Sequence, residues 1–291
     1  MIERLCIIGV GLIGGSLALA LKKAGFCQTV MGIGRSANNL ELALERKVID
    51  VASHDFSTVQ GADMVVLATP VGSTEKVCRE IADYLDESAV FTDVGSVKKA
   101  IVKQVASAFG ELPPNFVPGH PIAGNENSGA GAAIDDLFTG RRVLLTPAES
   151  TSEDALDKVR AMWQATGALV ETMSIDQHDR VLAVTSHLPH MLAFGLVDSL
   201  ARQEESEEIF RYAAGGFRDF TRIASSDPVM WRDICLYNRE ALLGAMDNYQ
   251  NDLAELRSAI EASDAAVLQS IFSHAKAARD QFVNGENGDD E

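Results

Sequence analysis

The stretch LCIIGVGLIGGS at residues 5–16 decides the fold, because it joins an apolar run to a glycine-rich turn and then to a helix. Gly9, Gly11 and Gly14 have the spacing GxGxxG. In a strand–turn–helix unit these glycines permit a tight turn, close approach of the backbone to a pyrophosphate, and close packing of the helix on the strand. The helix N-terminus offers free N–H groups to the phosphates. We therefore predict a dinucleotide site rather than a purely structural turn, with cofactor contacts from Gly9, Gly11, Leu12, Ile13 and Gly14.

Strand-like and helix-like segments alternate over residues 1–173. This pattern predicts an α/β domain of the Rossmann type, a doubly wound parallel sheet with helices on both faces. The expected strands are Leu5–Ile8, Thr29–Ile33, Asp63–Ala68, Val90–Asp93, Phe116–Val117, Val143–Thr146 and Ala168–Thr172. The expected helices include Leu12–Lys23, Lys76–Tyr84 and Val97–Phe109.

The sequence changes character after residue 173. Residues 174–284 are rich in Ala, Leu, Arg and Glu at helical spacing, which predicts an all-α domain of four or five helices that begins with a long helix near residue 176. Such a domain is too small to bury its apolar faces alone, so we expect a homodimer, with a cleft between the two domains of each chain. The acidic residues 285–291 are expected to form a disordered tail.

The overall charge limits the partners. Twenty-five basic residues against 42 acidic ones give a net charge of −17, which disfavours nucleic acid and anionic membranes. An anionic substrate must then be captured by individual cations in a cleft. The four cysteines form no CxxC pair, and we recognise no signal peptide and no uncharged apolar stretch of about 18 residues. We expect a reduced, cytoplasmic protein.

The end of the second expected strand bears on the choice between NAD and NADP. An acidic residue usually binds the ribose hydroxyls of NAD at this position, but here the strand is followed by Arg35 and Ser36. These residues favour NADP because they can hold a 2′-phosphate, although Arg35 could instead be a solvated cation that stacks on adenine. Thr69, Pro70 and Val71 follow a later strand at the edge of the sheet where the cofactor is expected.

Two segments at the same edge carry groups for proton transfer. Ser96 follows the strand Val90–Asp93 and is either the N-cap of the next helix or an active-site hydroxyl. His120 lies in Gly119–Gly124, which we expect to be an irregular loop because glycine and proline bracket it. An imidazole held rigidly there suits general acid–base catalysis near neutral pH, with a structural histidine as the alternative.

The helical half supplies further candidates. His187 and His190 share a helix face, and Pro189 between them predicts a kink. Neither a Glu in the HExxH arrangement nor a nearby Cys accompanies them, so we expect no metal. Arg218 and Arg222 also share a face if helical, and either could pair with Asp219 or bind a carboxylate in a bidentate fork.

Taken together, these motifs resemble the prephenate/arogenate (cyclohexadienyl) dehydrogenase family. They occur in the family's order over nearly the whole chain: GVGLIGGS at 9–16, GSVK at 95–98, GHPIAG at 119–124, SHLPH at 186–190, GFRDFTR at 216–222 and DPVMW at 227–231. The resemblance implies a Rossmann domain followed by a helical dimerisation domain.

The resemblance also implies roles for single residues. His120 would take the proton from the ring hydroxyl of the substrate, and Ser96 would hydrogen-bond to that histidine and to the substrate oxygen. His190 would line the pocket as a third residue of the catalytic set, together with His187, while Arg222 would hold a substrate carboxylate. Glu126 matches a loop acid near the mouth of the pocket.

The reaction implied is hydride transfer to NAD(P) coupled to decarboxylation of prephenate, which yields 4-hydroxyphenylpyruvate for tyrosine biosynthesis. Arogenate, or both substrates, remains the first alternative, and Glu126 could bind its ammonium group. Another small Rossmann enzyme, such as a β-hydroxyacid dehydrogenase or imine reductase, and a non-catalytic dinucleotide sensor are the others. We recognise no regulatory domain, so any inhibition by tyrosine is expected to be competition at the active site.

Overall fold

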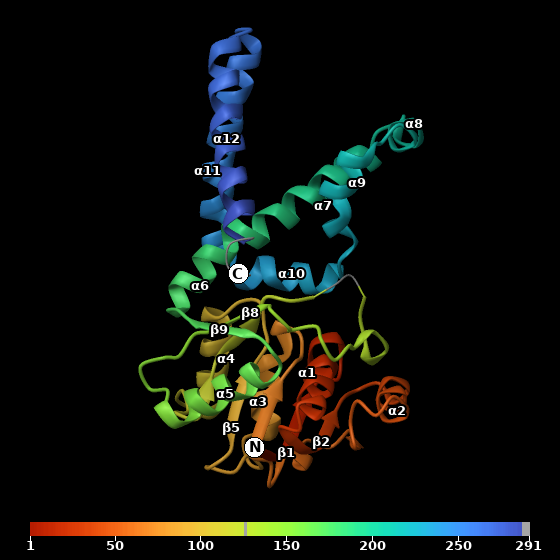
Figure 1. Ribbon diagram of the computed structural model, residues 1–291, viewed down its shortest axis with the longest axis vertical. Helices are drawn as coiled ribbons and strands as arrows, with labels where there is room; N and C mark the ends of the chain where they lie inside the picture. The colour runs from red at the N-terminus through yellow and green to blue at the C-terminus, as the bar shows by residue number, and fades with distance from the viewer. Residues whose placement is uncertain (125–126, 287–291) are drawn as a thin grey trace. The chain divides into compact units, whose positions relative to one another are not determined.

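The structure is a computed structural model that describes residues 1–124 and 127–286 of the 291-residue chain. The chain divides into two compact units, Met1–Leu242 and Leu243–Glu291. The first unit contains both sheets and the first helices of the C-terminal half (Figure 1). The predicted domain boundary at residue 173 therefore lies inside the first unit, and it stays a prediction.

A six-stranded sheet forms the base of the first unit (Figure 1). Its strands are β1 (Ile2–Ile8), β2 (Cys27–Ile33), β3 (Val51–Ser53), β4 (Met64–Leu67), β5 (Val90–Asp93) and β6 (Phe116–Val117). The order is β3-β2-β1-β4-β5-β6, and every neighbouring pair is parallel. The predicted doubly wound Rossmann sheet is confirmed. The strand order reverses between β1 and β4, and ligands bind doubly wound sheets at the carboxyl ends of the strands beside such a reversal.

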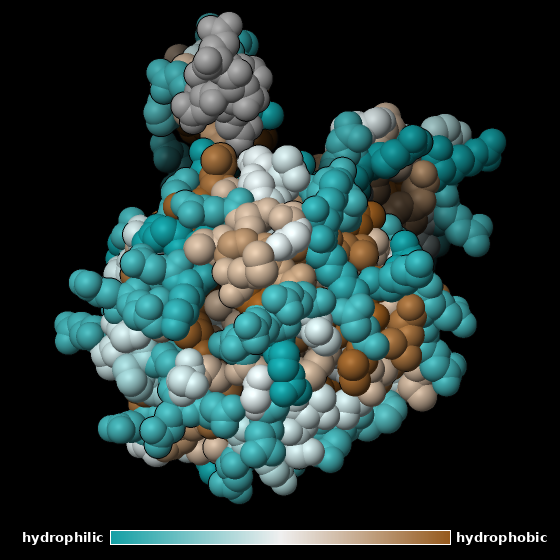
Figure 2. All heavy atoms as spheres, turned by 60° about the horizontal axis from the view of Figure 1, so that its bottom comes forward, coloured by the Kyte–Doolittle hydropathy of each residue, from teal (hydrophilic) through white to brown (hydrophobic). Residues whose placement is uncertain are grey.

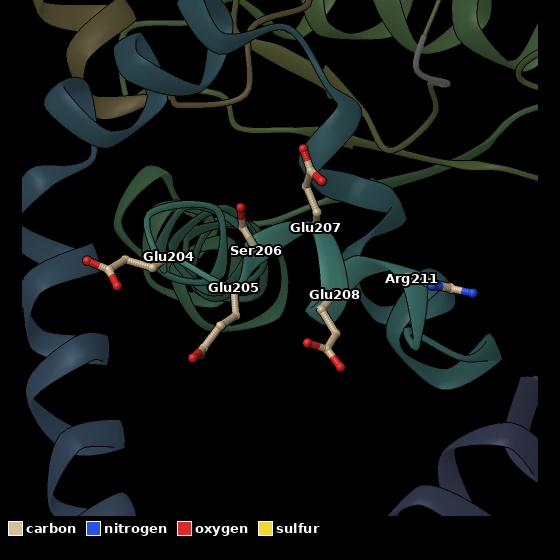
Figure 3. Close-up of a pocket in the computed structure, with 6 residues that line it drawn as sticks. All are labelled: Glu204, Glu205, Ser206, Glu207, Glu208 and Arg211. Atoms are coloured by element: carbon tan, nitrogen blue, oxygen red, sulfur yellow. The ribbon is translucent and has the colours of Figure 1, made fainter.

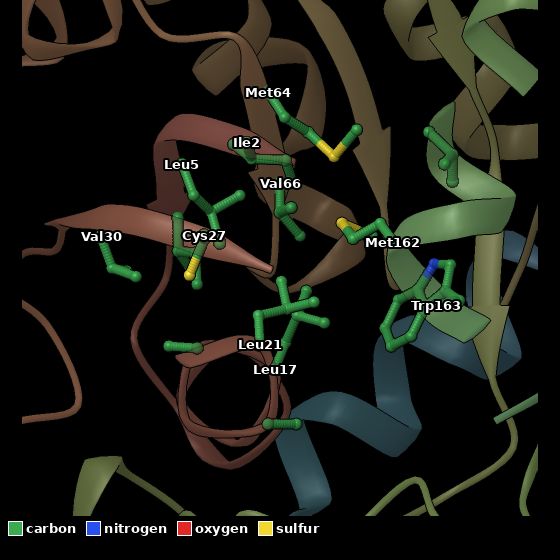
Figure 4. Packing of buried hydrophobic residues seen from close by; sticks show 14 of the residues in the cluster. Ile2, Leu5, Leu17, Leu21, Cys27, Val30, Met64, Val66, Met162 and Trp163 are labelled. Atoms are coloured by element: carbon green, nitrogen blue, oxygen red, sulfur yellow. The ribbon is translucent and has the colours of Figure 1, made fainter. Parts of the chain in front are cut away.

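Helices cover both faces of this sheet. They are α1 (Leu12–Lys23), α2 (Ala37–Glu45), α3 (Thr74–Ile81), α4 (Lys99–Phe109) and α5 (Glu153–Ala165). Alternate residues of β1 face opposite sides, so Leu5 packs in a cluster with Leu17 of α1 and Trp163 of α5 (Figure 4). Cys6 packs on the other side, with residues of α3 and α4. Burial on both faces explains why the strands are almost continuously apolar.

A second sheet of three strands carries the GHPIAG motif. Its strands are β7 (Gly119–Pro121), β8 (Arg142–Leu145) and β9 (Leu169–Thr172), with β7 antiparallel to β8 and β8 parallel to β9. The prediction of an irregular loop at His120 is therefore wrong for Gly119–Pro121. His120 pairs with Leu144 in the β7–β8 register, so its backbone is fixed on a strand.

The helical half contains more and shorter helices than predicted. Over the described residues it comprises α6 (Ile175–Leu182), α7 (Leu188–Ala201), α8 (Ser206–Arg211), α9 (Gly215–Thr221), α10 (Pro228–Tyr237), α11 (Arg239–Glu261) and α12 (Ala265–Glu286). A π-helical turn at Ala183–His187 joins α6 to α7, and Pro189 lies in the first turn of α7. The widened turn removes the strain that Pro189 would cause inside a regular helix.

By length and composition alone, the combined helix Ile175–Ala201 is long and apolar enough to cross a membrane, and 22% of its most apolar window is buried. Asp179 on this helix accepts hydrogen bonds from two backbone amides near the start of α4. This contact fixes the helix on the sheet domain and leaves an apolar surface facing outward.

The second unit, considered by itself, is a helical hairpin. Most of α11, from Leu243 onward, is joined to α12 by Ala262–Asp264, where Ser263 has a φ of 52°. Helix α12 extends to Glu286, and the rest of the predicted tail, residues 287–291, lies outside the described residues.

Candidate active site

A hollow of about 830 Å³ opens at the carboxyl ends of β1, β2 and β4. These are the strands on either side of the reversal in strand order, where a nucleotide is expected. Gly9 and Gly11 of the glycine-rich turn line the hollow. Leu12, Ile13 and Gly14, which were predicted as contacts, form the first turn of α1 and are not among the residues that line it.

The glycines of the turn have the geometry that a dinucleotide site needs. A Cβ at Gly9, where φ is +100°, would lie 2.4 Å from the carbonyl oxygen of Ala68, and one at Gly14 would lie 2.5 Å from that of Gly9. A Cβ at Gly11 would have no described atom within 4 Å. Gly11 is the N-cap residue of α1, and no side-chain hydrogen bond caps this helix in the described structure. The uncapped backbone amides in the first turn of α1 and the open space beside Gly11 together fit a pyrophosphate.

Basic side chains contribute to the lining of the same hollow. Arg35, His54 and Lys76 line it, together with Glu80. The Nδ1–H of His54 donates to the carbonyl oxygen of Gly34 at 2.7 Å, so a neutral His54 has its Nε2 free to accept. Ser36 caps α2, because its hydroxyl oxygen accepts the amide of Asn39 at 3.3 Å. The hydroxyl proton of Ser36 can still be donated to a ligand.

The turn after β4 connects the hollow to the catalytic candidates. Thr69 and Pro70 line the hollow, and the buried Oγ1 of Thr69 has no hydrogen-bond partner in the described part of the chain. Val71 is instead buried, and its Cγ2 lies 3.6 Å from the position of a Cβ at Gly95. The turn Thr69–Val71 after β4, here called the cofactor loop, is therefore in contact with the loop Gly95–Lys98.

His120 is the most deeply buried of the predicted catalytic residues at this edge, with 8% of its surface exposed. Its Nδ1 lies 2.9 Å from Nε2 of His178. Burial lowers the pKa of His120 well below 6.5, and the proximity of His178, Lys98 and His187 lowers it further. His120 is therefore neutral at neutral pH, as a general base must be.

Behind His120, residues of α6 continue the hydrogen bonding. Nδ1 of His178 lies 2.8 Å from Oδ1 of Asp179, which also accepts the amide of Lys98 at 2.8 Å. Oδ2 of Asp179 accepts the amide of Lys99 at 2.9 Å. Helix α4 begins at Lys99, so its N-terminus is capped by Asp179 from another helix, and the alternative that Ser96 is the N-cap is wrong.

A buried ion pair holds the loop before α4 against β7. The ammonium group of Lys98 contacts Asp93 and also donates to the carbonyl oxygen of Gly119 at 2.6 Å. Asp93 accepts the amides of Gly95 at 2.7 Å and Gly119 at 3.2 Å. Burial raises the pKa of Asp93 and lowers that of Lys98, while the contact between them opposes both changes. The pair fixes the residue that precedes His120.

His187 is buried at the end of the π-helical turn and is neutral, because burial lowers its pKa to about 4. Its Nδ1 lies 3.1 Å from Nδ2 of Asn238, which also donates to the carbonyl oxygen of Asp179 at 2.8 Å. With Nδ1 accepting from Asn238, the single proton of His187 lies on Nε2. The structure thus presents this histidine as a hydrogen-bond donor.

His190 stacks on Trp231 of α10, with ring centroids 3.7 Å apart and planes at 20°. Its Nδ1–H donates to the carbonyl oxygen of Ser186 at 2.8 Å, which leaves Nε2 as an acceptor when the ring is neutral. Burial lowers the pKa of His190, and the charge of Arg222 lowers it too. Arg222, the first residue of a 3-10 turn after α9, is therefore close to His190.

For Ser96 and Glu126, the structure gives less detail about contacts within the site. Ser96 is partly buried in the loop between β5 and α4. Its backbone lies near enough to His187 to affect the pKa of that ring. Glu126 lies outside the described residues.

The sequence interpretation missed His178, Asp179 and Asn238. A sequence signal was present for the first two, because His178 and Asp179 lie at helical spacing between the apolar residues Ile175 and Leu182, on the face expected to be buried. A histidine and an aspartate at core positions need partners, which indicates a polar network.

A second hollow, of about 660 Å³, shares no lining residue with the first and is mainly acidic. Figure 3 shows it around α8, with Glu204 and Arg211 pointing away from each other. Its lining is Glu204, Glu205, Ser206, Glu207, Glu208 and Arg211. Four carboxylates repel an anionic substrate, so this hollow is not the active site.

Figure 2 shows that hydrophilic residues also cover much of one face of the molecule.

Two family models match the chain. The model for the nucleotide-binding domain of prephenate dehydrogenase matches residues 17–172, and the model for the dimerization domain of prephenate dehydrogenase matches residues 174–274. Together they include the catalytic candidates from both halves of the chain, and they begin after the glycine-rich turn at residues 9–14.

Individual proteins are similar over almost the full chain. A prephenate dehydrogenase of Bacillus subtilis (strain 168) is 39% identical over 285 residues, which are 96% of this chain and 76% of that protein. A cyclohexadienyl dehydrogenase of Zymomonas mobilis is 37% identical over 283 residues, 95% of each chain. The crystal structure of prephenate dehydrogenase from A. aeolicus, in complex with hydroxyphenyl propionate and NAD+, matches with a TM-score of 0.91 and 36% identity, covering 97% of this chain and 99% of that one.

Proposed function

The chain belongs to the prephenate dehydrogenase family, and from this premise we propose that it oxidises prephenate to 4-hydroxyphenylpyruvate and carbon dioxide with NAD(P) as hydride acceptor. The observation that carries the proposal is the buried, neutral His120, held on β7 near the cofactor loop. A neutral imidazole can accept the proton of a ring hydroxyl, and this proton transfer allows the ring carbon to release hydride.

Different residues of this chain transfer the proton and orient the substrate. Nε2 of His120 takes the hydroxyl proton, and Ser96 orients the same oxygen by a hydrogen bond. His187 donates from Nε2 and His190 accepts at Nε2, so the two can fix different oxygens of the substrate. The nicotinamide supplies the hydride acceptor when it is bound. Loss of carbon dioxide then makes the ring aromatic and the reaction effectively irreversible.

Arg222 orients the substrate by holding a carboxylate. Its proximity to His190 supports this role, because it brings a permanent cation beside a pocket histidine in a chain whose net charge is −17. The carboxylate that leaves must not be bound too tightly, since binding that is stronger in the ground state raises the barrier. We therefore assign to Arg222 a contribution mainly to KM.

Arogenate is the second candidate substrate. It is favoured by the similarity to a cyclohexadienyl dehydrogenase, a name that covers both ring substrates. The two substrates differ in their side chain, a pyruvyl group in prephenate and an amino acid in arogenate. Glu126 stays our proposed partner for an ammonium group.

For the cofactor we propose a preference for NADP over NAD. Two cationic side chains, Arg35 and Lys76, line the hollow against one acidic side chain, Glu80. The hydroxyl of Ser36 adds a donor at the same place. This set is suited to a 2′-phosphate and lacks the ribose-binding acid directly after β2.

One assay tests these proposals together. Purified protein is mixed with prephenate or arogenate, each with NAD or NADP, and formation of reduced nicotinamide is followed by its absorbance. We expect turnover with prephenate, and a higher kcat/KM with NADP than with NAD. Replacement of Arg35 by Asp should reverse the cofactor preference. No turnover in any mixture would exclude the proposed reaction, and a simple hydroxyacid would then be the next substrate to test.

We further propose that the active form is a cytoplasmic homodimer. Large apolar side chains are exposed on the helical hairpin of the second unit, among them Ile260, Phe272 and Phe282, each about 60% exposed. Covering one such Phe contributes about 2 kcal/mol. Phe272→Glu should therefore shift the solution mass from dimer towards monomer, while the exposed neighbour change Ser273→Glu should not. A monomeric wild-type protein at micromolar concentration would contradict the dimer.

Tyrosine, if it inhibits, should compete with prephenate, because its ring and carboxylate resemble those of the product. Initial rates at several tyrosine concentrations should show a raised KM and an unchanged kcat. An effect that saturating prephenate does not relieve would indicate a separate tyrosine site.

A further inference from the structure

We propose that His178 and Asp179 are positioning residues that hold His120 in the tautomer with its proton on Nδ1, so that Nε2 is the atom that accepts the substrate proton. The inference rests on the proposed role of His120 as the base. It assigns a function to two side chains of α6 that come from the helical half of the chain.

The first step is the ionisation of Asp179. Its two oxygens accept the amides of Lys98 and Lys99, at the positive end of the eleven-residue helix α4. Burial raises the pKa of Asp179, but hydrogen bonds from His178 and from these two amides lower it more, and the net direction is downward. Asp179 is therefore a carboxylate at neutral pH, and a carboxylate can only accept hydrogen bonds.

The second step is the tautomer of His178. Because Asp179 only accepts, the contact of 2.8 Å between its Oδ1 and Nδ1 of His178 requires a proton on Nδ1. The His178 ring is fully buried, and burial lowers its pKa although the bond to Asp179 opposes this. A neutral ring has a single N–H, so Nε2 of His178 must be an acceptor.

The third step uses the acceptor on His178 to assign the tautomer of His120. Nε2 of His178 lies 2.9 Å from Nδ1 of His120, so the acceptor on His178 requires Nδ1–H on His120. The lone pair of His120 is then on Nε2, the nitrogen that His178 leaves free for substrate. When Nε2 takes the hydroxyl proton, the charged ring keeps its hydrogen bond from Nδ1 to His178, which stabilises it.

The charged groups around His120 explain why its tautomer must be fixed by hydrogen bonds. The ionisable groups that lower its pKa are His178, Lys98 and His187, on three different segments. With both histidines neutral, the Lys98 cation is the group that disfavours a charged His120, whereas the carboxylate of Asp179 is connected to the ring through the hydrogen bonds and favours it. A misplaced proton on His120 would turn the base into a donor towards the substrate hydroxyl.

Two amide substitutions at His178 distinguish a role in positioning His120 from a role in packing alone. In His178→Gln, the side-chain oxygen can reach the place of Nε2 and accept from His120. In His178→Asn, the shorter amide can reach Asp179 but not His120. The Gln variant keeps the acceptor for His120 and the Asn variant keeps the donor to Asp179. Asp179 still accepts the two amides of Lys98 and Lys99 in both, so thermal unfolding should show both folded.

We expect His178→Gln to keep kcat within a few-fold of wild type. His178→Asn should lower kcat by about 10²–10⁴-fold, as when a catalytic histidine loses the partner that fixes its tautomer, with little change in KM. As a control, His274→Gln changes an exposed histidine of α12 and should leave kcat unchanged. Equal losses in the two His178 variants, or wild-type kcat in His178→Asn, would overturn the proposal.

A spectroscopic measurement tests the tautomer without substrate. In protein labelled with ¹⁵N-histidine, the His120 signals should show an unprotonated Nε2 in wild type and in His178→Gln, and a protonated fraction in His178→Asn. A protonated Nε2 in wild-type protein would overturn the inference. Failure of wild type to oxidise prephenate or arogenate would instead remove the proposed function, and the NMR result would still report on the His178 arrangement.

Discussion

At the scale of single residues, the site separates a proton-transfer group from a binding group. His120 is buried, neutral and held by hydrogen bonds, whereas Arg222 carries a permanent charge beside His190. A group that acts only as the proton moves contributes to kcat, and a group that binds the ground state and the transition state equally contributes to KM. The two residues should therefore give opposite kinetic signatures when replaced.

We expect His120→Asn to lower kcat by about 10²–10⁴-fold with little change in KM, because it removes the base. Arg222→Gln should raise KM for prephenate about 10–100-fold with a smaller change in kcat, because it removes a charge-assisted bond to a carboxylate. Steady-state kinetics with saturating cofactor measure both. Arg218→Gln, an exposed arginine one helical turn earlier, is the control and should change neither constant. A large loss of kcat with unchanged KM in Arg222→Gln would contradict its role in binding.

Residue chemistry was predictable where a motif is local in sequence. Gly9 and Gly11 were assigned to a nucleotide from their spacing between an apolar strand and a helix, and the structure places them in a hollow at the carboxyl ends of the strands. The partners of His120 were not predictable in this way, because His178 is 58 residues away and becomes a neighbour only through the fold. Spacing along the chain carries no information about such a contact.

At the scale of elements, the buried strands of the parallel sheet (β1, β2, β4, β5 and β6) were predicted well, whereas the short edge strand β3 (Val51–Ser53) and the short strand β7 were not. The former are apolar on both faces, a pattern that the sequence shows directly. Gly119–Pro121 contains a glycine and a proline, and it is a strand only because β8 supplies the hydrogen-bonding partner. Local propensity opposes this strand, and pairing with a residue more than twenty positions away overrides it.

The cap of α4 has the same non-local origin, and it gives a stability prediction. Asp179→Ala removes two hydrogen bonds at the N-terminus of α4 and leaves His178 without its buried acceptor. We expect it to lower the free energy of unfolding by about 3 kcal/mol. Urea unfolding followed by circular dichroism measures this loss.

Asp176→Ala is the matched control, since Asp176 lies on the same helix but is 77% exposed and makes only a surface pair with Lys99 at 3.5 Å. It should have little effect on stability. Equal unfolding midpoints for the two variants would show that Asp179 does not hold α4.

At the scale of the whole molecule, buried histidines make the stability depend on pH. The pKa values of His120, His178, His187 and His190 are all lowered in the folded protein, chiefly by burial. The unfolded chain, with ordinary values near 6.5, then binds more protons than the folded chain once the pH drops to that range. Stability must rise with pH wherever the unfolded state binds more protons.

The folded protein should therefore be most stable above pH 6.5 and should lose stability as the pH falls from 6.5 towards 4, the region set by the lowered pKa of His187, about 4. For His187 alone the loss on reaching pH 4 is on the order of 3 kcal/mol. Most carboxylates titrate below pH 5, so the slope between pH 6.5 and 5 belongs to the histidines, although relief of the net charge of −17 opposes it at lower pH. Urea unfolding at several pH values should show this slope, reduced in His187→Gln and unchanged in His274→Gln. A stability that is constant or increases between pH 6.5 and 5 would mean that these rings are not buried in neutral form, and the assignment of His120 as a neutral base would fall with it.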